Sequence, residues 1–166
     1  MTKKVLNAID NMNMRFSYMN NKVDRLSNIL YHKFGCVHFS EILHQDMAHA
    51  YKNILLDEIV ELKTLFGFDS NYPTVIGAIN TYETLYDLFL DLYEETEKTK
   101  EQILELIDIC REDGSIDFSY FVVEIFKNFM KYVQSTRILM IKSKDYNILS
   151  FDVEAPIWYI RVGESS

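Results

Sequence analysis

Residues 67–81, GFDSNYPTVIGAINT, lie between two pairs of long helical patterns and decide how those pairs can be arranged. The stretch contains Pro73, Gly77 and several Asn and Asp residues, a composition typical of a loop. About 15 residues can span roughly 50 Å in extended form, and a helix of about 30 residues is roughly 45 Å long. A link between antiparallel neighbours needs only about 2–8 residues. We therefore expect this stretch to cross the whole bundle, which makes the helices on either side of it parallel.

Apolar residues recur at three- and four-residue spacings on both sides of this loop, as they do in amphipathic helices. We predict helices at about residues 2–33, 38–66, 82–111 and 117–142. The first helix carries an unbroken apolar stripe: Val5, Ile9, Met12, Phe16, Met19, Val23, Leu26 and Leu30. Ser40 is the predicted N-cap of the second helix, and Thr84 and Asp87 are spaced like a capping box before the third. We predict that the inward row of the second helix runs through Leu43, Met47, Ala50, Ile54 and Leu65. A second apolar row through Leu55, Ile59, Leu62 and Phe66 leaves the exact facing open.

The short links at Gly35 and Gly114 predict two antiparallel helical hairpins. With the long crossover, they indicate an all-α four-helix bundle over residues 1–145, followed by a tail at residues 146–166. Pro156 disfavours a regular helix in that tail, and apolar residues recur there with a period of two. We expect an extended strap that packs on the bundle or on a neighbouring molecule.

The composition excludes several classes of function. A net charge of −8 argues against a direct nucleic-acid partner. No run of 18 uncharged apolar residues predicts a membrane span, and the N-terminal residues do not resemble a signal peptide. Cys36 and Cys110 form no recognisable framework, so we expect reduced thiols and a cytoplasmic location.

Three stretches of the second half, Leu85–Phe89, Leu106–Asp113 and Ile148–Asp152, resemble bacterial non-haem ferritins, as do the length and layout of nearly the whole chain. The resemblance implies a ferritin-like bundle with iron as the bound metal. It also implies assembly, either with further copies as a cage or dimer or together with an active ferritin.

A weaker similarity links the chain to the Dps-type mini-ferritins. Leu43-His44, Met47 and Tyr51 look like pieces of their second helix, and His32 resembles the histidine of their first helix. This resemblance implies a metal site between subunits that uses His32, His44 and either Asp57 or Glu61.

Active ferritins bind two irons through a Glu on the first helix, Glu-x-x-His on the second, Glu on the third and Gln or Glu on the fourth. The positions that correspond here carry Ser17 or Arg15, Ala50 with Asn53 (or His49 with Lys52), Thr96, Phe129 and Tyr132. A buried carboxylate cluster would also interrupt the apolar stripes, and the first stripe is unbroken. We expect a degenerate ferroxidase centre with no catalytic residues, its volume filled by Tyr132 and Phe129.

Seven side chains remain as candidate metal ligands: His44, Asp46, His49, Asp57, Glu61, Glu95 and Glu97. Asp46 and His49 share one face of the second helix, which could also be an ordinary solvated face. Glu95 and Glu97 belong to an acidic patch that gathers cations or is neutralised by Lys98 and Lys100. The sequence thus leaves two functions open: an iron-storage subunit with a degenerate ferroxidase centre, or a metal-free scaffold or interaction protein.

Overall fold

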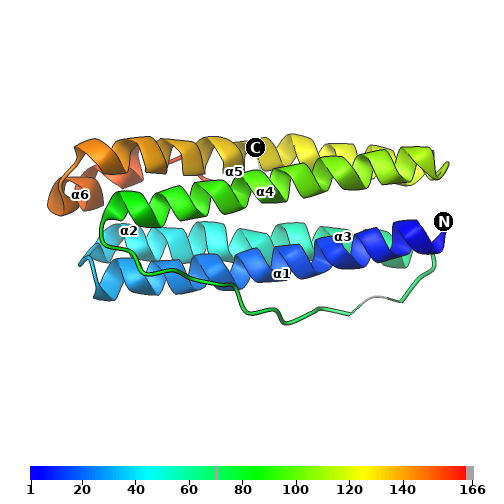
Figure 1. Ribbon diagram of the computed structural model, residues 1–166, viewed down its shortest axis with the longest axis horizontal. Helices are drawn as coiled ribbons and strands as arrows, with labels where there is room; N and C mark the ends of the chain where they lie inside the picture. The colour runs from blue at the N-terminus through cyan, green and yellow to red at the C-terminus, as the bar shows by residue number, and fades with distance from the viewer. Residues whose placement is uncertain (70, 164–166) are drawn as a thin grey trace.

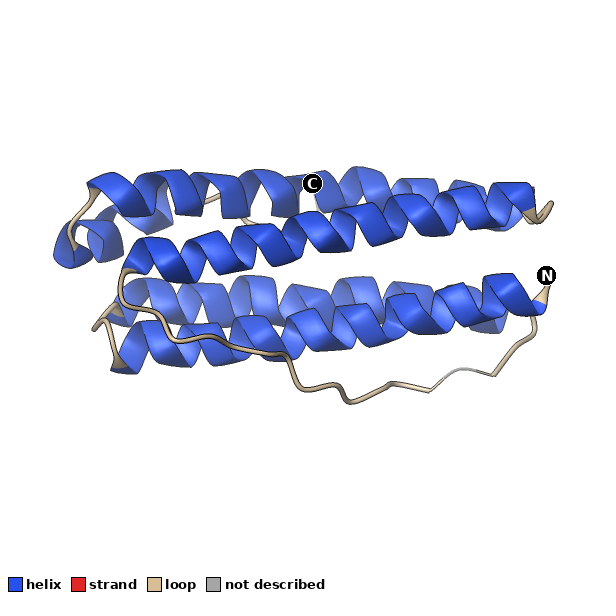
Figure 2. Ribbon diagram, in the orientation of Figure 1, coloured by secondary structure: helices blue, strands red, loops and turns tan. Residues whose placement is uncertain are grey.

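The computed structural model describes residues 1–69 and 71–163, so positions 164–166 of the predicted tail lie outside the described residues. The described residues form four long, nearly parallel rods and one short helix (Figures 1 and 2). The helices are α1 (Lys3–His32), α2 (Val37–Ile42), α3 (Asp57–Leu65), α4 (Leu85–Glu112), α5 (Ile116–Asp145) and α6 (Ile148–Trp158). Two π-helical segments, η1 (Leu43–Ala48) and η2 (Tyr51–Leu56), join α2 to α3 in one continuous rod. No helix in the described part is both long and apolar enough to cross a membrane.

The predicted apolar stripe of α1 forms one wall of the core, and each of its residues is at most 1% exposed. At the start of α4 the predicted capping box is confirmed. The Thr84 hydroxyl accepts from the Asp87 backbone N–H at 3.1 Å, and the Asp87 carboxylate accepts from the Thr84 N–H at 3.2 Å. These reciprocal bonds satisfy two donors that a helix start otherwise leaves unpaired.

The π-helical segments explain which row of the second rod faces inward. Leu43, Met47, Tyr51, Leu55 and Ile59 recur every four residues, and all are fully buried. At 3.6 residues per turn, each four-residue step would rotate such a row by about 40°. A π turn contains one extra residue, so η1 and η2 keep the row on the core side. The prediction that Ile54 and Leu65 face inward was wrong, because this backbone turns them to solvent, with exposed fractions of 36% and 70%.

The crossover runs as an extended segment along α1, from the end of α3 to the start of α4 (Figure 1). It therefore places α3 and α4 in the same direction, as its length predicts. A polar row on α1 holds it. Ser17 donates to the Pro73 carbonyl at 2.8 Å and accepts from the Val75 N–H at 3.0 Å. Asn21 accepts from the Gly77 N–H at 2.7 Å.

The prediction of an extended tail from residue 148 was wrong, because residues Ile148–Trp158 form the helix α6. The Asn147 side chain caps its start by accepting from the Ser150 N–H at 2.8 Å. Pro156 lies in the last turn, and the helix ends two residues later, so its missing N–H affects little of the helix. Only residues 159–163 leave the helix as a strap.

Asp152 of α6 also corrects the predicted N-cap of the second rod. Its carboxylate accepts from the backbone N–H groups of Phe39 at 2.8 Å and His38 at 3.2 Å. Ser40 lies inside α2, and Cys36 at the N-cap position makes no side-chain cap. A carboxylate from a distant helix thus replaces the local cap and ties α6 to the bundle.

Gly77 is required where the crossover approaches α1. A Cβ at this position would lie 2.6 Å from the Lys22 Cβ and 2.7 Å from the Lys22 backbone nitrogen. We expect Gly77→Ala to lower the free energy of unfolding by about 1–3 kcal/mol, because backbone or helix must shift. Urea denaturation would measure the loss. Thr74→Ala, at an exposed position of the same segment, is the control and should change stability by less than about 0.5 kcal/mol; equal losses would contradict the close approach.

Candidate functional site

The interior of the bundle is aromatic at the positions that the sequence resemblance predicts to correspond to di-iron ligands. Phe129 and Tyr132 of α5 are buried and stack with ring centroids 5.0 Å apart. Tyr51 of η2 packs edge-on against Tyr132 at 5.1 Å. Thr96 of α4, fully buried, donates to the Leu92 carbonyl of its own helix at 2.8 Å. Ser17 points to the crossover and Asn53 is exposed, so neither joins this group.

The two phenols in this interior are neutral. Burial raises the pKa of Tyr132, and the neighbouring Tyr51 adds to the rise. Burial also raises the pKa of Tyr51. The Thr96 hydroxyl and the charge of Arg15 lower this pKa, but they offset only part of the rise. The Tyr132 hydroxyl has no hydrogen-bond partner among the described residues. A di-iron site needs carboxylate and imidazole ligands. Two neutral phenols and a threonine hydroxyl that donates to its own helix do not supply them, so these residues do not fit a di-iron site.

Glu95, which directly precedes the buried Thr96 on α4, is bound within the chain. The Arg15 guanidinium of α1 lies 3.2 Å from its carboxylate and also donates to its backbone carbonyl at 2.7 Å. Lys98 lies 3.2 Å from the other carboxylate oxygen. Burial alone would raise the pKa of Glu95, but a hydrogen bond with Tyr18 and the charges of Arg15, Lys98 and Lys22 outweigh burial and lower it. Glu95 is therefore an ionised partner of α1.

A second buried ion pair joins the same two helices. Lys22 of α1, only 2% exposed, lies 2.9 Å from the Asp91 carboxylate of α4 and donates to the Ala78 carbonyl of the crossover. The Tyr82 hydroxyl donates to the same carboxylate. The sequence patterns do not predict this pair. Its signal was Lys22 itself, which follows Met19 by three residues on the buried side of α1.

Asp46 is the most completely satisfied of the seven candidates. Its carboxylate, in η1, accepts from the Tyr159 hydroxyl at 2.7 Å and from the backbone N–H groups of Val162 and Gly163, both at 2.8 Å. It is 7% exposed. In this structure Asp46 anchors the strap after α6, and its oxygens face protein donors on the α6 side.

The acidic candidates on α3 and α4 are spread over different faces. Glu97 lies 2.7 Å from the Lys100 amine, and its hydrogen bond lowers the pKa of the Glu97 carboxyl. Asp57 borders a pocket of about 550 Å³ beneath the crossover, which Tyr72 also lines, and the Asp57 carboxylate raises the pKa of the Tyr72 phenol. Glu61 is exposed. The described residues contain no group of three or more His, Cys, Asp or Glu side chains that could hold a metal ion.

The structure does bring His44 and His49 together. Their ring centroids lie 4.7 Å apart, edge to face. Asp24 of α1 bonds to Nδ1 of His44. The sequence placed the two histidines in separate hypotheses, because five residues apart on an α-helix are not neighbours.

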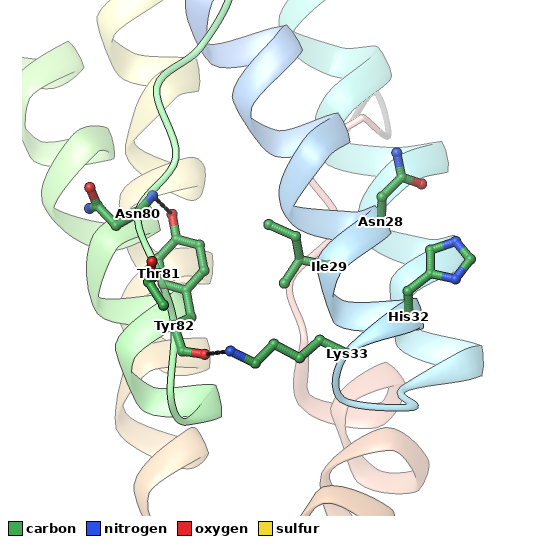
Figure 3. A pocket seen from close by; sticks show the side chains of 7 residues that line it. All are labelled: Asn28, Ile29, His32, Lys33, Asn80, Thr81 and Tyr82. Atoms are coloured by element: carbon green, nitrogen blue, oxygen red, sulfur yellow. Dashed lines mark hydrogen bonds between the residues drawn. The ribbon is translucent and has the colours of Figure 1, made fainter.

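His32 belongs to another part of the surface, where α1 ends beside the crossover. It borders a pocket of about 310 Å³ (Figure 3), together with Asn28, Ile29, Lys33, Asn80, Thr81 and Tyr82. The Lys33 amine donates to the Tyr82 carbonyl, and the Asn80 N–H donates to the Tyr82 hydroxyl at 3.1 Å. The lining includes no carboxylate. These bonds hold the end of the crossover against α1.

Comparisons with known proteins establish the fold and not the chemistry. No model of a known protein family matches the sequence, and no curated protein matches it. Several solved structures do match. The ferritin of M. penetrans aligns with a TM-score of 0.83 at 9% identity, over 93% of this chain and 95% of that one. An open-pore ferritin of the archaeon Archaeoglobus fulgidus aligns with a TM-score of 0.79 at 14% identity, over 95% and 97%. A bacterioferritin of Mycobacterium tuberculosis aligns with a TM-score of 0.75 at 13% identity, over 93% and 95%. The chain therefore has a ferritin-like fold.

The Arg15–Glu95 pair predicts a pH-dependent loss of stability. Because the pKa of Glu95 is lower in the folded chain than its usual value of 4.5, its contribution is fully present above that value and is lost as the pH falls through the folded-state pKa. We expect Glu95→Gln to cost about 3–5 kcal/mol at neutral pH, since it leaves Arg15 without its partner. This difference from the wild-type chain should shrink in acid. Urea denaturation across the pH range tests this, with the exposed Glu94→Gln as control; a pH-independent difference would contradict it.

The two buried phenols Tyr132 and Tyr159 predict opposite effects of the same change. Tyr132→Phe removes a buried hydroxyl without a partner, so we expect the free energy of unfolding to rise by about 1 kcal/mol. Tyr159→Phe removes a hydrogen bond to the Asp46 carboxylate, so we expect a loss of about 1.5–3 kcal/mol. Thermal denaturation of both variants measures these two changes in stability. A loss at Tyr132 as large as that at Tyr159 would show that its hydroxyl is satisfied.

Proposed function

We propose that this chain is a subunit of a ferritin-like assembly that takes part in iron storage without a di-iron oxidation centre of its own. The observation that carries the proposal is the combination of a ferritin-like fold over nearly the whole chain with an aromatic interior at the ligand positions. Iron is the cargo in this proposal and not a resident cofactor of the bundle.

The chemistry of Fe(II) supports this division. Ferrous iron favours carboxylate and imidazole ligands, and two adjacent irons allow O₂ to be reduced in paired electron steps. Tyr51, Thr96 and Tyr132 supply no such ligands in the interior. Iron would instead gather at exposed carboxylates such as Glu61, Glu94 and Glu101, in a chain with a net charge of −8. Oxidation would then occur at these surfaces or in an active partner subunit.

The outer face of α6 supports assembly. Leu149, Val153 and Ile157 follow one another at four-residue spacing and are 78%, 65% and 76% exposed. An apolar row of this kind is typical of a surface that another protein covers. The proposal allows either further copies of this chain or an active ferritin as the neighbour.

A second candidate function is a metal-free scaffold that keeps the ferritin-like bundle for interaction alone. This function is favoured because two of the candidate metal ligands already bind other groups of the chain. Glu95 is paired with Arg15 and Lys98, and Asp46 is saturated by the strap.

Light scattering and iron loading of the purified chain separate these functions. We expect an assembly larger than a dimer that retains iron added slowly as Fe²⁺ in air. We also expect O₂ uptake to proceed no faster than in a protein-free control, because the bundle interior offers no di-iron ligands.

The control is an active ferritin loaded under the same conditions, alone and co-expressed with this chain to detect mixed assemblies. A monomer or dimer that retains no iron, alone or when co-expressed, would contradict storage and favour the scaffold. Rapid O₂ uptake in proportion to the chain concentration would contradict the degenerate centre.

A further inference from the structure

We propose that His44 and His49 form a surface binding site for a divalent transition-metal ion of the Zn²⁺ or Cu²⁺ class, built by the π-helical segment η1 and oriented by Asp24. This inference is independent of the proposed iron storage, because it uses neither the bundle interior nor the exposed carboxylates of α3 and α4.

The π-helical backbone creates the pair. On an α-helix a residue and the fifth one after it are about 140° apart around the axis, so their side chains diverge. Here His44 lies in η1 and His49 follows its last residue, and the extra residue of the π turn reduces that angle. The two rings consequently meet, with centroids 4.7 Å apart and planes inclined by 64°. Single-turn π segments occur frequently at functional sites.

Asp24 fixes the protonation geometry that a metal ligand needs. With the Asp24 carboxylate on Nδ1 of His44, the ring proton lies on Nδ1 and donates to the carboxylate. The lone pair of Nε2 is then left for a metal. Carboxylate–histidine pairs of this kind hold metal-ligating imidazoles in place and raise their basicity.

The same face of α1 also supports the other end of η1. Asn20, one turn before Asp24, donates from its side-chain amide to the Ala48 carbonyl at 2.6 Å. That carbonyl directly precedes His49 in the chain. Helix α1 thus holds η1 beside both histidines, so the two rings can share an ion with little movement of the backbone.

The spacing and exposure of the rings suit a shared ion. A metal 2.0–2.1 Å from one nitrogen of each imidazole requires ring centroids about 5 Å apart, close to the 4.7 Å observed. The side chain of His44 is 40% exposed and that of Asp24 is 45% exposed, so an ion can enter and water can complete its coordination. Imidazole selects Zn²⁺, Cu²⁺ or Ni²⁺ over Mg²⁺ and Ca²⁺. Cys36 and Cys110 are fully buried and do not compete.

Titration of the full chain with Zn²⁺, followed by calorimetry, tests the proposal. We expect one site whose affinity falls more than tenfold in His44→Gln and in His49→Gln, because each removes one of two protein ligands. Asp24→Asn should weaken binding by about tenfold through the orientation of His44. The chain contains four histidines, so His32→Gln and His38→Gln are matched controls and should bind as the wild type does.

Electron paramagnetic resonance with Cu²⁺ gives a second readout that does not depend on stability. We expect superhyperfine splitting from two imidazole nitrogens in the wild type. His44→Gln and His49→Gln should each show splitting from one imidazole nitrogen. Unchanged melting temperatures would show that the variants remain folded. Binding that survives in both His44→Gln and His49→Gln, or that falls equally in all four histidine variants, would overturn the proposal.

Discussion

An extended chain segment that crosses the side of a helical bundle has backbone N–H and C=O groups that no helix satisfies, and those groups must find partners. In this protein the partners are side chains of α1. Ser17, Asn21 and Arg25 form a polar row that makes hydrogen bonds to backbone groups of the crossover. The close approach at Gly77 follows from the same contact. Because this contact holds the crossover along α1, it supports the parallel order of α3 and α4.

The charged side chains at the α1–α4 contact take part in this arrangement. Arg15 with Glu95 and Lys22 with Asp91 lie between the two helices, and Lys22 also reaches the crossover. Buried ion pairs of this kind contribute little net stability, but the loss of one partner is strongly destabilising because it leaves a buried charge unpaired. The ferritin-like architecture is thus maintained here by α1-centred pairs and by aromatic packing of Tyr51, Phe129 and Tyr132.

Local patterns predicted what depends on local structure. The stripe of α1, the Thr84–Asp87 cap and the length of the crossover were readable because each depends on spacing along a few residues. The cap of α2 was not, since Asp152 supplies it from more than a hundred positions away. The helix α6 was not predicted because a proline disfavours a helix. Pro156 lies in the last turn, where its missing N–H affects little of the helix. Among the candidate ligands, the pairing of His44 with His49 depends on a π turn, which spacing rules for α-helices do not include.

The strap on Asp46 has a consequence for the order in which the molecule forms. Asp46 and Gly163 are 117 positions apart, so a ribosome adding roughly 5–20 residues per second synthesises the second about 6–23 seconds after the first. Throughout that interval the Asp46 carboxylate lacks its three donors and must stay hydrated, because an unpaired charge is too costly to bury. The Asp46 carboxylate therefore reaches its final buried position only after residues 159–163 have been synthesised. The contacts of residues 159–163 with Asp46 are thus among the last contacts of the bundle that can form during synthesis.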